Sequence, residues 1–197
     1  TWRVTAGNDT VTGSDGRDSI AAGSGNDVVD GRGGADTLYG NDGNDRLNGG
    51  DGNDKLYGGA GSDRLIYTAG FDLLDGGSGT DTIDFGYFNK AVYVSLGLSG
   101  TDAFTSGTNR ATAATATTAL GDLVSVEAVV GTVYDDLIIG SSGANTLSGS
   151  GGADTINGGG GNDVLNGGRG NDIFIFNAGW GADTIEDFQR GKDTWIR

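Results

Sequence analysis

Residues 49–66 read GGDGNDKLY-GGAGSDRLI, two tandem copies of a nine-residue unit with the pattern G-G-x-G-x-D-x-U-x, in which U is aliphatic. The unit recurs at residues 76–84 as GGSGTDTID. A repeat of fixed period predicts an array of similar structural units, each too small to bury its apolar residue alone. This stretch therefore decides the fold class before any other feature of the chain.

The unit keeps its phase over a long part of the chain. An Asp occurs every nine residues from Asp9 to Asp81, with a Gly two residues before it and an aliphatic residue two residues after it. The pattern resumes one residue out of phase, and the aspartate position is then held by Asp136, Asn145, Asp154, Asp163 and Asp172. Because Gly, Asp and aliphatic residues keep the same spacing in every copy, the pattern argues against a disordered, glycine-rich chain.

The repeats divide the chain into four segments. We expect a first block at 1–85, an intervening strand and Thr/Ala-rich loop at 86–126, a second block at 127–176 and a C-terminal cap at 177–197. Residues 91–98 (AVYVSLGL) alternate and predict a strand, whereas residues 101–118 predict a loop or lid. The apolar residues expected to bury the last coil are Phe174, Phe176, Ile185 and Phe188.

The repeat spacing predicts an all-β parallel β-roll. The six residues GGxGxD favour a turn with several positive φ angles, and x-U-x favours a short strand with U pointing inward. Two repeats then form one coil, so residues 18 apart lie above one another, about 4.8 Å apart. One edge would carry Asp27, Asp45 and Asp63, and the other would carry Asp36, Asp54 and Asp72.

Composition points to cations as partners. The chain has 197 residues with 41 Gly, no Pro, Cys, Met or His, and a formal net charge of −15. Only 12 Lys and Arg are present, which argues against nucleic acid, and no apolar run is long enough for a membrane span. Without His or Cys, the chain cannot form a His-based catalytic triad, a thiolate metal site or a disulfide.

Stacked carboxylates repel one another unless a divalent cation lies between the coils. Ca²⁺ takes six to eight oxygen ligands, which carboxylates and the unshielded carbonyls of glycines can supply. Ten intervals between stacked turns are candidate sites, and several are weak, so we expect about seven or eight ions. The predicted ligands are Asp9, Asp18, Asp27, Gly31, Gly34, Asp36, Gly40, Gly43, Asp45, Gly49, Gly50, Gly52, Asp54, Gly58, Gly59, Gly61, Asp63, Asp72, Gly76, Gly77, Gly79, Asp81, Asp136, Gly149, Gly152, Asp154, Gly158, Gly159, Gly161, Asp163, Gly167, Gly168, Gly170 and Asp172.

The repeats at residues 7–84 and 131–176 resemble the RTX (repeats-in-toxin) calcium-binding nonapeptide family. Residues 122–140 resemble the linker between RTX blocks, and residues 181–197 resemble the end of RTX blocks in serralysin-type proteases. The resemblance implies a parallel β-roll with ions held by turn aspartates and carbonyls. It also implies export through a type I secretion apparatus in the unfolded state, followed by calcium-driven folding outside the cell.

We therefore expect a secreted, extracellular, non-catalytic module that stabilises a parent protein. The chain does not begin with Met and is expected to be a fragment or a processed product. Alternatives are a polysaccharide-binding or adhesin module, as beside alginate epimerases, or the C-terminal domain of a secreted protease or lipase. Tyr39 and Tyr57, 18 residues apart, predict an ordinary cross-strand ladder or a platform for a sugar or polyanion. Glu127 is either a surface residue or structural cap, or a further calcium ligand.

Overall fold

The computed structural model describes residues 2–4, 6–96, 101–105, 118–177 and 181–197, and it confirms an all-β parallel β-roll. Two compact units are present. The first comprises residues 1–87 and 120–126, and the second comprises residues 88–119 and 127–197. Within the described ranges no helix occurs, and thus none that is long and apolar enough to cross a membrane.

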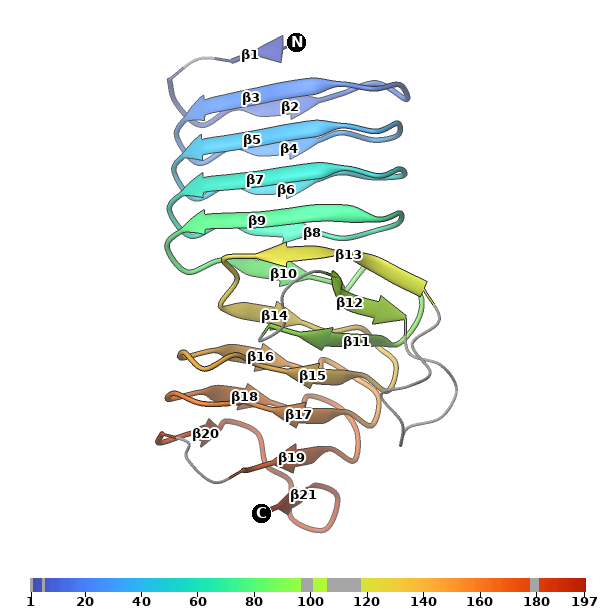
Figure 1. Cartoon of the computed structure of the whole chain (residues 1–197), viewed down its shortest axis with the longest axis vertical. Helices are drawn as coiled ribbons and strands as arrows, with labels where there is room; N and C mark the ends of the chain where they lie inside the picture. Colours follow the sequence, from blue (N-terminus) through green and yellow to red (C-terminus); the bar gives the residue numbers. More distant parts are fainter. Residues whose placement is uncertain (1, 5, 97–100, 106–117, 178–180) are drawn as a thin grey trace. The chain divides into compact units, whose positions relative to one another are not determined.

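The first unit consists of two parallel stacks of strands (Figure 1). One stack contains, in order, β1 (Trp2–Arg3), β3 (Ser19–Ser24), β5 (Thr37–Asp42), β7 (Lys55–Ala60), β9 (Asp72–Ser78) and β13 (Thr118–Val124). The other contains β2 (Thr10–Thr12), β4 (Val28–Asp30), β6 (Arg46–Asn48), β8 (Arg64–Ile66) and β10 (Thr82–Asp84).

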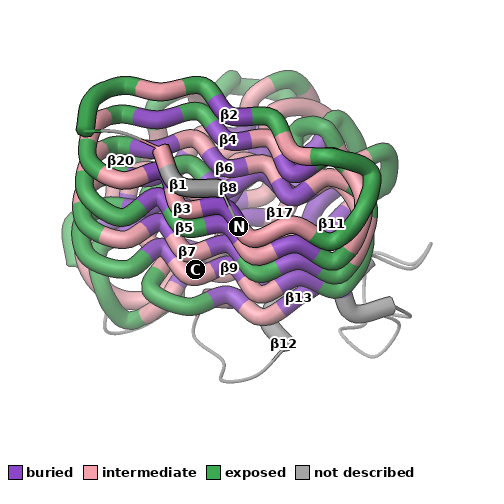
Figure 2. The backbone as a smooth tube through the Cα atoms, turned by 90° about the horizontal axis from the view of Figure 1, so that it is seen from above, coloured by how far each residue is buried: buried purple, intermediate pink, exposed green. Residues whose placement is uncertain are grey.

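The register of the first unit follows the repeat. Leu38 pairs with Leu56, and Leu47 pairs with Leu65, so residues 18 apart are neighbours in the sheets. Because side chains alternate across a strand, the middle residue of each x-U-x strand points inward. Figure 2 shows the buried positions recurring at the same place in successive coils. The repeat aliphatics of this unit are all buried: Val11, Ile20, Val29, Leu38, Leu47, Leu56, Leu65, Leu74 and Ile83.

The second unit repeats this arrangement. One stack contains β12 (Thr101–Thr105), β11 (Val92–Ser95), β15 (Leu137–Ile139), β17 (Thr155–Asn157), β19 (Ile173–Ile175) and β21 (Thr194–Ile196). The other contains β14 (Ala128–Val130), β16 (Thr146–Ser148), β18 (Val164–Asn166) and β20 (Thr184–Ile185). The inward ladder includes Val129, Ile138, Leu147, Ile156, Leu165 and Phe174.

The intervening segment corrects two predictions. The strand expected at 91–98 ends at Ser95, because β11 pairs in parallel with the three-residue strand β15, and Leu96 already lies in a turn. Leu98 lies outside the described residues, as do residues 106–117 of the expected loop. Residues 101–105 form β12 rather than a loop, because they pair antiparallel with β11 and supply its free edge with hydrogen-bond partners.

The cap continues the coils. β20 pairs in parallel with β18, and β21 pairs in parallel with β19. Phe174 is fully buried, and its ring lies 6.3 Å from that of Phe188. The C-terminal strand therefore extends the stack, although its Trp195 is 59% exposed.

Candidate metal centres

The turn aspartates form a hydrogen-bonded ladder along each edge. The Oδ1 atom of each accepts the backbone N–H of the Asp 18 residues earlier, as in Asp27 to Asp45 (2.7 Å) and Asp36 to Asp54 (2.8 Å). These carboxylates are buried, with Asp45 and Asp54 each 2% exposed. One oxygen of each carboxylate is thus committed to joining two coils. The bonded pairs further include Asp9–Asp27, Asp18–Asp36, Asp45–Asp63, Asp54–Asp72, Asp63–Asp81, Asp136–Asp154 and Asp154–Asp172.

A second ladder runs along one edge of the first unit, through the residue before the Asp. The Oδ1 atom of Asn26 accepts the backbone N–H of Asn44 at 2.9 Å, and the Oδ1 atom of Asn44 accepts that of Ser62 at 2.8 Å. These bonds run in the opposite direction from those of the aspartates, so the turns along this edge are hydrogen-bonded to both neighbours without any ion. The recurring pair Asn-Asp was the sequence signal for this ladder, and our sequence analysis did not use it.

The second carboxylate oxygen has no such partner in most turns. These Oδ2 atoms are inaccessible to solvent and lack a hydrogen bond in Asp27, Asp36, Asp45, Asp54, Asp63, Asp154, Asp163 and Asp183. A buried anionic oxygen without a partner costs free energy, because it loses its water and gains nothing in return. Such an atom is what a bound cation would satisfy.

The local electrostatics agree with that interpretation. Burial raises the pKa of Asp154 to about 8, although the N–H of Asp136 lowers it, and the carboxylates of Asp136 and Asp172 raise it further. Burial likewise raises the pKa of Asp63 to about 6, with Asp45 and Asp81 adding repulsion. These carboxylates therefore resist ionisation unless positive charge is supplied.

Most of these unpaired Oδ2 atoms, here called orphan oxygens, face a glycine, and several also face a backbone carbonyl oxygen; Asp27 is an exception, because Ala22 holds the first position of its turn. A Cβ atom on Gly31 would lie 2.5 Å from Oδ2 of Asp36 and 2.6 Å from the carbonyl oxygen of Gly49 in the next coil. In this turn, a side chain at the first position would fill the space in which these hard oxygens converge. The same two kinds of oxygen converge at Gly40, Gly58 and Gly149.

The other glycines of the turn serve the backbone. The second and fourth positions adopt positive φ, as at Gly50 (96°) and Gly52 (142°), which side chains disfavour. A few second positions carry another residue in the same conformation, namely Arg32, Asn41 and Ser150. The turn glycines thus fix the path of the chain and leave its carbonyls unshielded.

Side chains alone do not complete a site. Among the described residues, no group of three Asp, Glu, His or Cys side chains could hold a metal ion. Since Ca²⁺ needs six to eight oxygens, backbone carbonyls must supply most of them. The residues present therefore fit Ca²⁺: paired coils supply carboxylates with a free oxygen and carbonyls beside glycines.

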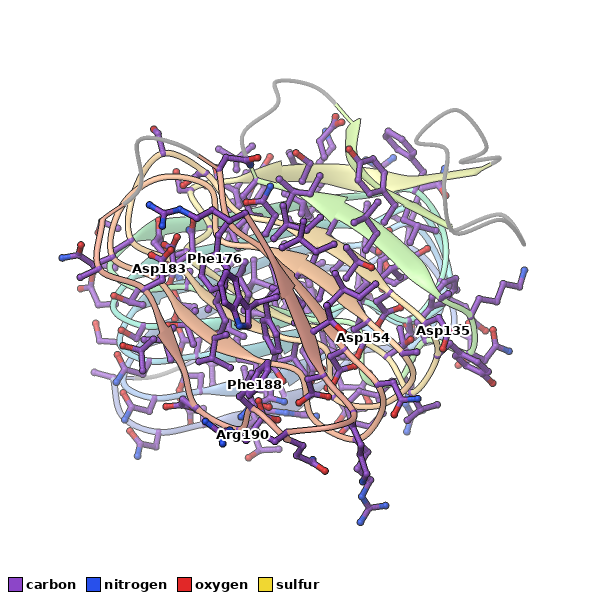
Figure 3. All side chains as sticks on the ribbon, turned by 90° about the horizontal axis from the view of Figure 1, so that it is seen from below. Asp135, Asp154, Phe176, Asp183, Phe188 and Arg190 are labelled. Atoms are coloured by element: carbon purple, nitrogen blue, oxygen red, sulfur yellow. The ribbon has the colours of Figure 1, made fainter. Side chains whose placement is uncertain are left out.

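The structure adds two aspartates that the sequence analysis missed. Oδ1 of Asp183 accepts the N–H of Asp163 at 3.0 Å, and Oδ1 of Asp193 accepts that of Asp172 at 3.2 Å, so both continue the ladders. Asp154 and Asp183 lie on opposite sides of the second unit (Figure 3). A fixed step of nine failed here because the coils lengthen after Asp172. The shorter motif G-x-D-x-U, present at 181–185, was the available signal.

Four residues at the aspartate position differ from the rest. In the turns that end at Asp18, Asp136, Asn145 and Asp193, a side-chain oxygen accepts a hydrogen bond from within its own turn. The two predicted rows of stacked aspartates, Asp27, Asp45 and Asp63 on one edge and Asp36, Asp54 and Asp72 on the other, are the rows observed. Glu127 lies one coil before Asn145, and its carbonyl oxygen accepts the N–H of Thr146 at 2.9 Å.

The fold is a parallel β-roll, and its stacked turns bring carboxylate and carbonyl oxygens together beside glycines. These features define the class of calcium-binding β-roll modules. The family model of the RTX calcium-binding nonapeptide repeat matches at residues 4–38, 30–65, 68–86, 130–165, 139–174 and 148–185, which together make up more than half of the chain. The chain belongs to this RTX repeat family. No curated protein matches it closely enough to count as a relative.

Proposed function

We propose that this chain is a calcium-folded module of a secreted extracellular protein and stabilises that parent protein. The observation that carries the proposal is the row of buried Oδ2 atoms without partners in both units, from Asp27 to Asp183. Without a cation these atoms oppose folding, and with one they join successive coils.

Ca²⁺ binding then contributes directly to the folding equilibrium. An ion that binds only the folded state adds its binding free energy to the stability of that state. Extracellular calcium modules bind at about 10⁻⁴–10⁻³ M, far above cytosolic concentrations. The chain would therefore remain unfolded inside the cell, pass through a type I secretion apparatus, and fold outside.

The number of ions follows from the turns. The orphan oxygens occur on both edges of each unit, as with Asp45 and Asp54 in the first and Asp154 and Asp163 in the second. If each marks one ion, the module holds about seven or eight, in keeping with the oxygen preference of Ca²⁺.

The structure favours this role over a sugar-binding one. The rings of Tyr39 and Tyr57 lie 5.0 Å apart and nearly parallel, at 8°. Each ring covers one face of the other, which removes that face from contact with a sugar, although Tyr39 remains 39% exposed. The pair therefore supports an ordinary cross-strand ladder.

The RTX β-roll is a non-catalytic fold. If the parent is a protease or lipase, its catalytic residues lie in another domain.

A calcium titration followed by circular dichroism tests the proposal. We expect a disordered spectrum in EDTA and a cooperative β transition on addition of Ca²⁺. Full β content and an unchanged melting temperature in EDTA would refute it. A glycan array in millimolar Ca²⁺ tests the alternative, because specific binding there would favour a polysaccharide-binding or adhesin module.

A further inference from the structure

In three turns, the residue at the second position donates both its N–H and its hydroxyl to the side-chain oxygen at the aspartate position. In a fourth, only an N–H is available, and Gln189 donates it to Oδ2 of Asp193 at 2.6 Å. In the turn at 13–18, the N–H and the hydroxyl of Ser14 both donate to Oδ2 of Asp18, at 2.7 and 2.9 Å. In the turn at 131–136, the N–H of Thr132 donates to Oδ2 of Asp136 at 2.6 Å, and its hydroxyl lies 3.1 Å from the same Oδ2 and 2.9 Å from Oδ1. In each case the donor occupies the second position of the turn, four residues before the acceptor.

The turn at 140–145 makes the same pattern with an uncharged acceptor. The N–H and the hydroxyl of Ser141 donate to Oδ1 of Asn145 at 2.7 and 3.1 Å, and Nδ2 of Asn145 donates to the carbonyl oxygen of Glu127 at 3.2 Å. An amide brings no negative charge, and here it has hydrogen-bond partners for both of its polar atoms. The side chain at the aspartate position of this turn therefore leaves no polar atom for an ion to satisfy.

The turns with an unpaired Oδ2 atom differ at the same position. Wherever the structure describes the second residue of such a turn, that residue has positive φ, as in Gly50 before Asp54 (96°) and Ser150 before Asp154 (71°). None of the second-position residues Ser14, Thr132 and Ser141 has positive φ. Ser150 shows that the residue type is not sufficient, because its hydroxyl donates to the carbonyl oxygen of Gly131 at 3.3 Å instead.

The position of the two turns of the second unit in their stacks accounts for the difference there. In the second unit, Val92 donates its N–H to Oδ1 of Asp136 at 2.7 Å, in the place that an Asp takes elsewhere. Glu127 takes the corresponding place before Asn145. Neither preceding segment is a glycine-rich turn in the sequence, so neither offers the unshielded carbonyls that would supply the other ligands of an ion.

We infer that the turns at 13–18, 131–136 and 140–145 close without Ca²⁺, and that the hydroxyl and N–H of Ser14, Thr132 and Ser141 take the place of the ion. The inference rests on the proposed calcium function and narrows it. Two of the aspartates predicted as ligands, Asp18 and Asp136, are thereby assigned to metal-free turns. In the second unit the ion-dependent stack starts from two turns that are already closed.

Isosteric substitutions at adjacent positions of one ladder test the inference. Asp18→Asn keeps an oxygen for Ser14, whereas Asp36→Asn keeps the oxygen that accepts the N–H of Asp18 and replaces the orphan Oδ2 with an amide. Bound Ca²⁺ is counted by equilibrium dialysis on the folded full chain, and the folding midpoint is taken from circular dichroism. We expect Asp18→Asn to match wild type and Asp36→Asn to lose bound Ca²⁺ and to fold only at several-fold higher Ca²⁺.

A second pair tests the hydroxyl itself. Thr132→Val removes a buried donor to Asp136 at nearly constant volume, so in saturating Ca²⁺ the melting temperature should fall by about 3–10 °C with the ion count unchanged. Ser150→Gly is the control: its hydroxyl does not reach Asp154, so neither quantity should fall. Loss of an ion in Asp18→Asn, or an unchanged melting temperature in Thr132→Val, overturns the inference. Wild type without bound Ca²⁺ overturns the proposed function itself.

Discussion

Asp45→Asn should have opposite consequences with and without Ca²⁺. Oδ1 of Asp45 accepts the N–H of Asp27 at 2.7 Å, and asparagine retains that bond. The substitution therefore acts at the unpaired Oδ2 atom, where it replaces an anionic oxygen with an amide. With Ca²⁺ it removes a ligand, and in chelator it removes a buried charge whose pKa is raised by burial.

The magnitude follows from linkage. One ion with a dissociation constant of about 10⁻⁴–10⁻³ M contributes roughly 1.4–2.7 kcal/mol at about 10 mM Ca²⁺. For a chain of this size, a loss of that amount lowers the melting temperature by about 3–11 °C. In EDTA the same substitution should leave the residual β content unchanged or raise it.

Asp42→Asn is the matched control. Asp42 lies three residues away, its side chain is exposed, and its substitution changes the net charge by the same amount. Thermal melts and Ca²⁺ titrations followed by circular dichroism compare the two variants. If both titrate alike, or if Asp45→Asn destabilises the protein equally in Ca²⁺ and in EDTA, the assignment of the orphan oxygen to a cation is refuted.

Three further predictions concern the same turns. Burial raises the pKa of Asp72 and Asp154 to about 8, so protonation of these carboxyls favours the folded, calcium-free state. This contribution to stability is present at acidic pH and is lost as the pH rises through about 8. In EDTA, a β content that rises with pH would contradict the prediction. Gly58→Ala should raise the Ca²⁺ concentration at the folding midpoint, because the new Cβ would meet Oδ2 of Asp63 and the carbonyl oxygen of Gly76. The control is Gly33→Ala, whose Cβ would meet no atom closer than 3.8 Å. Equal midpoints in the two variants would argue against a calcium site beside Gly58. Mg²⁺ should induce far less β structure than Ca²⁺ at equal concentration, because it demands octahedral geometry and retains its waters, and an equal transition would exclude a calcium-selective site.

Much of the fold follows from local spacing. Because the nine-residue step fixes which residues are inward and which stack, the pairing of Leu38 with Leu56 was predictable, as was the stacking of Tyr39 on Tyr57. Positive φ at the second and fourth turn positions also follows from glycine at these places. The β12 strand was not predictable in this way, because it depends on the free edge of β11 rather than on a repeat.

The sequence by itself determined the β-roll, its register and the two rows of turn aspartates, because a strict period specifies neighbours 18 residues apart. Only the tertiary structure decided which carboxylate oxygens lack a partner. Ser141 and Ser150 hold the same position of the repeat, yet one donates its hydroxyl to Asn145 and the other to the carbonyl of Gly131 in the neighbouring coil. That choice depends on the coil stacked beneath each turn, which the nine residues of the unit do not encode.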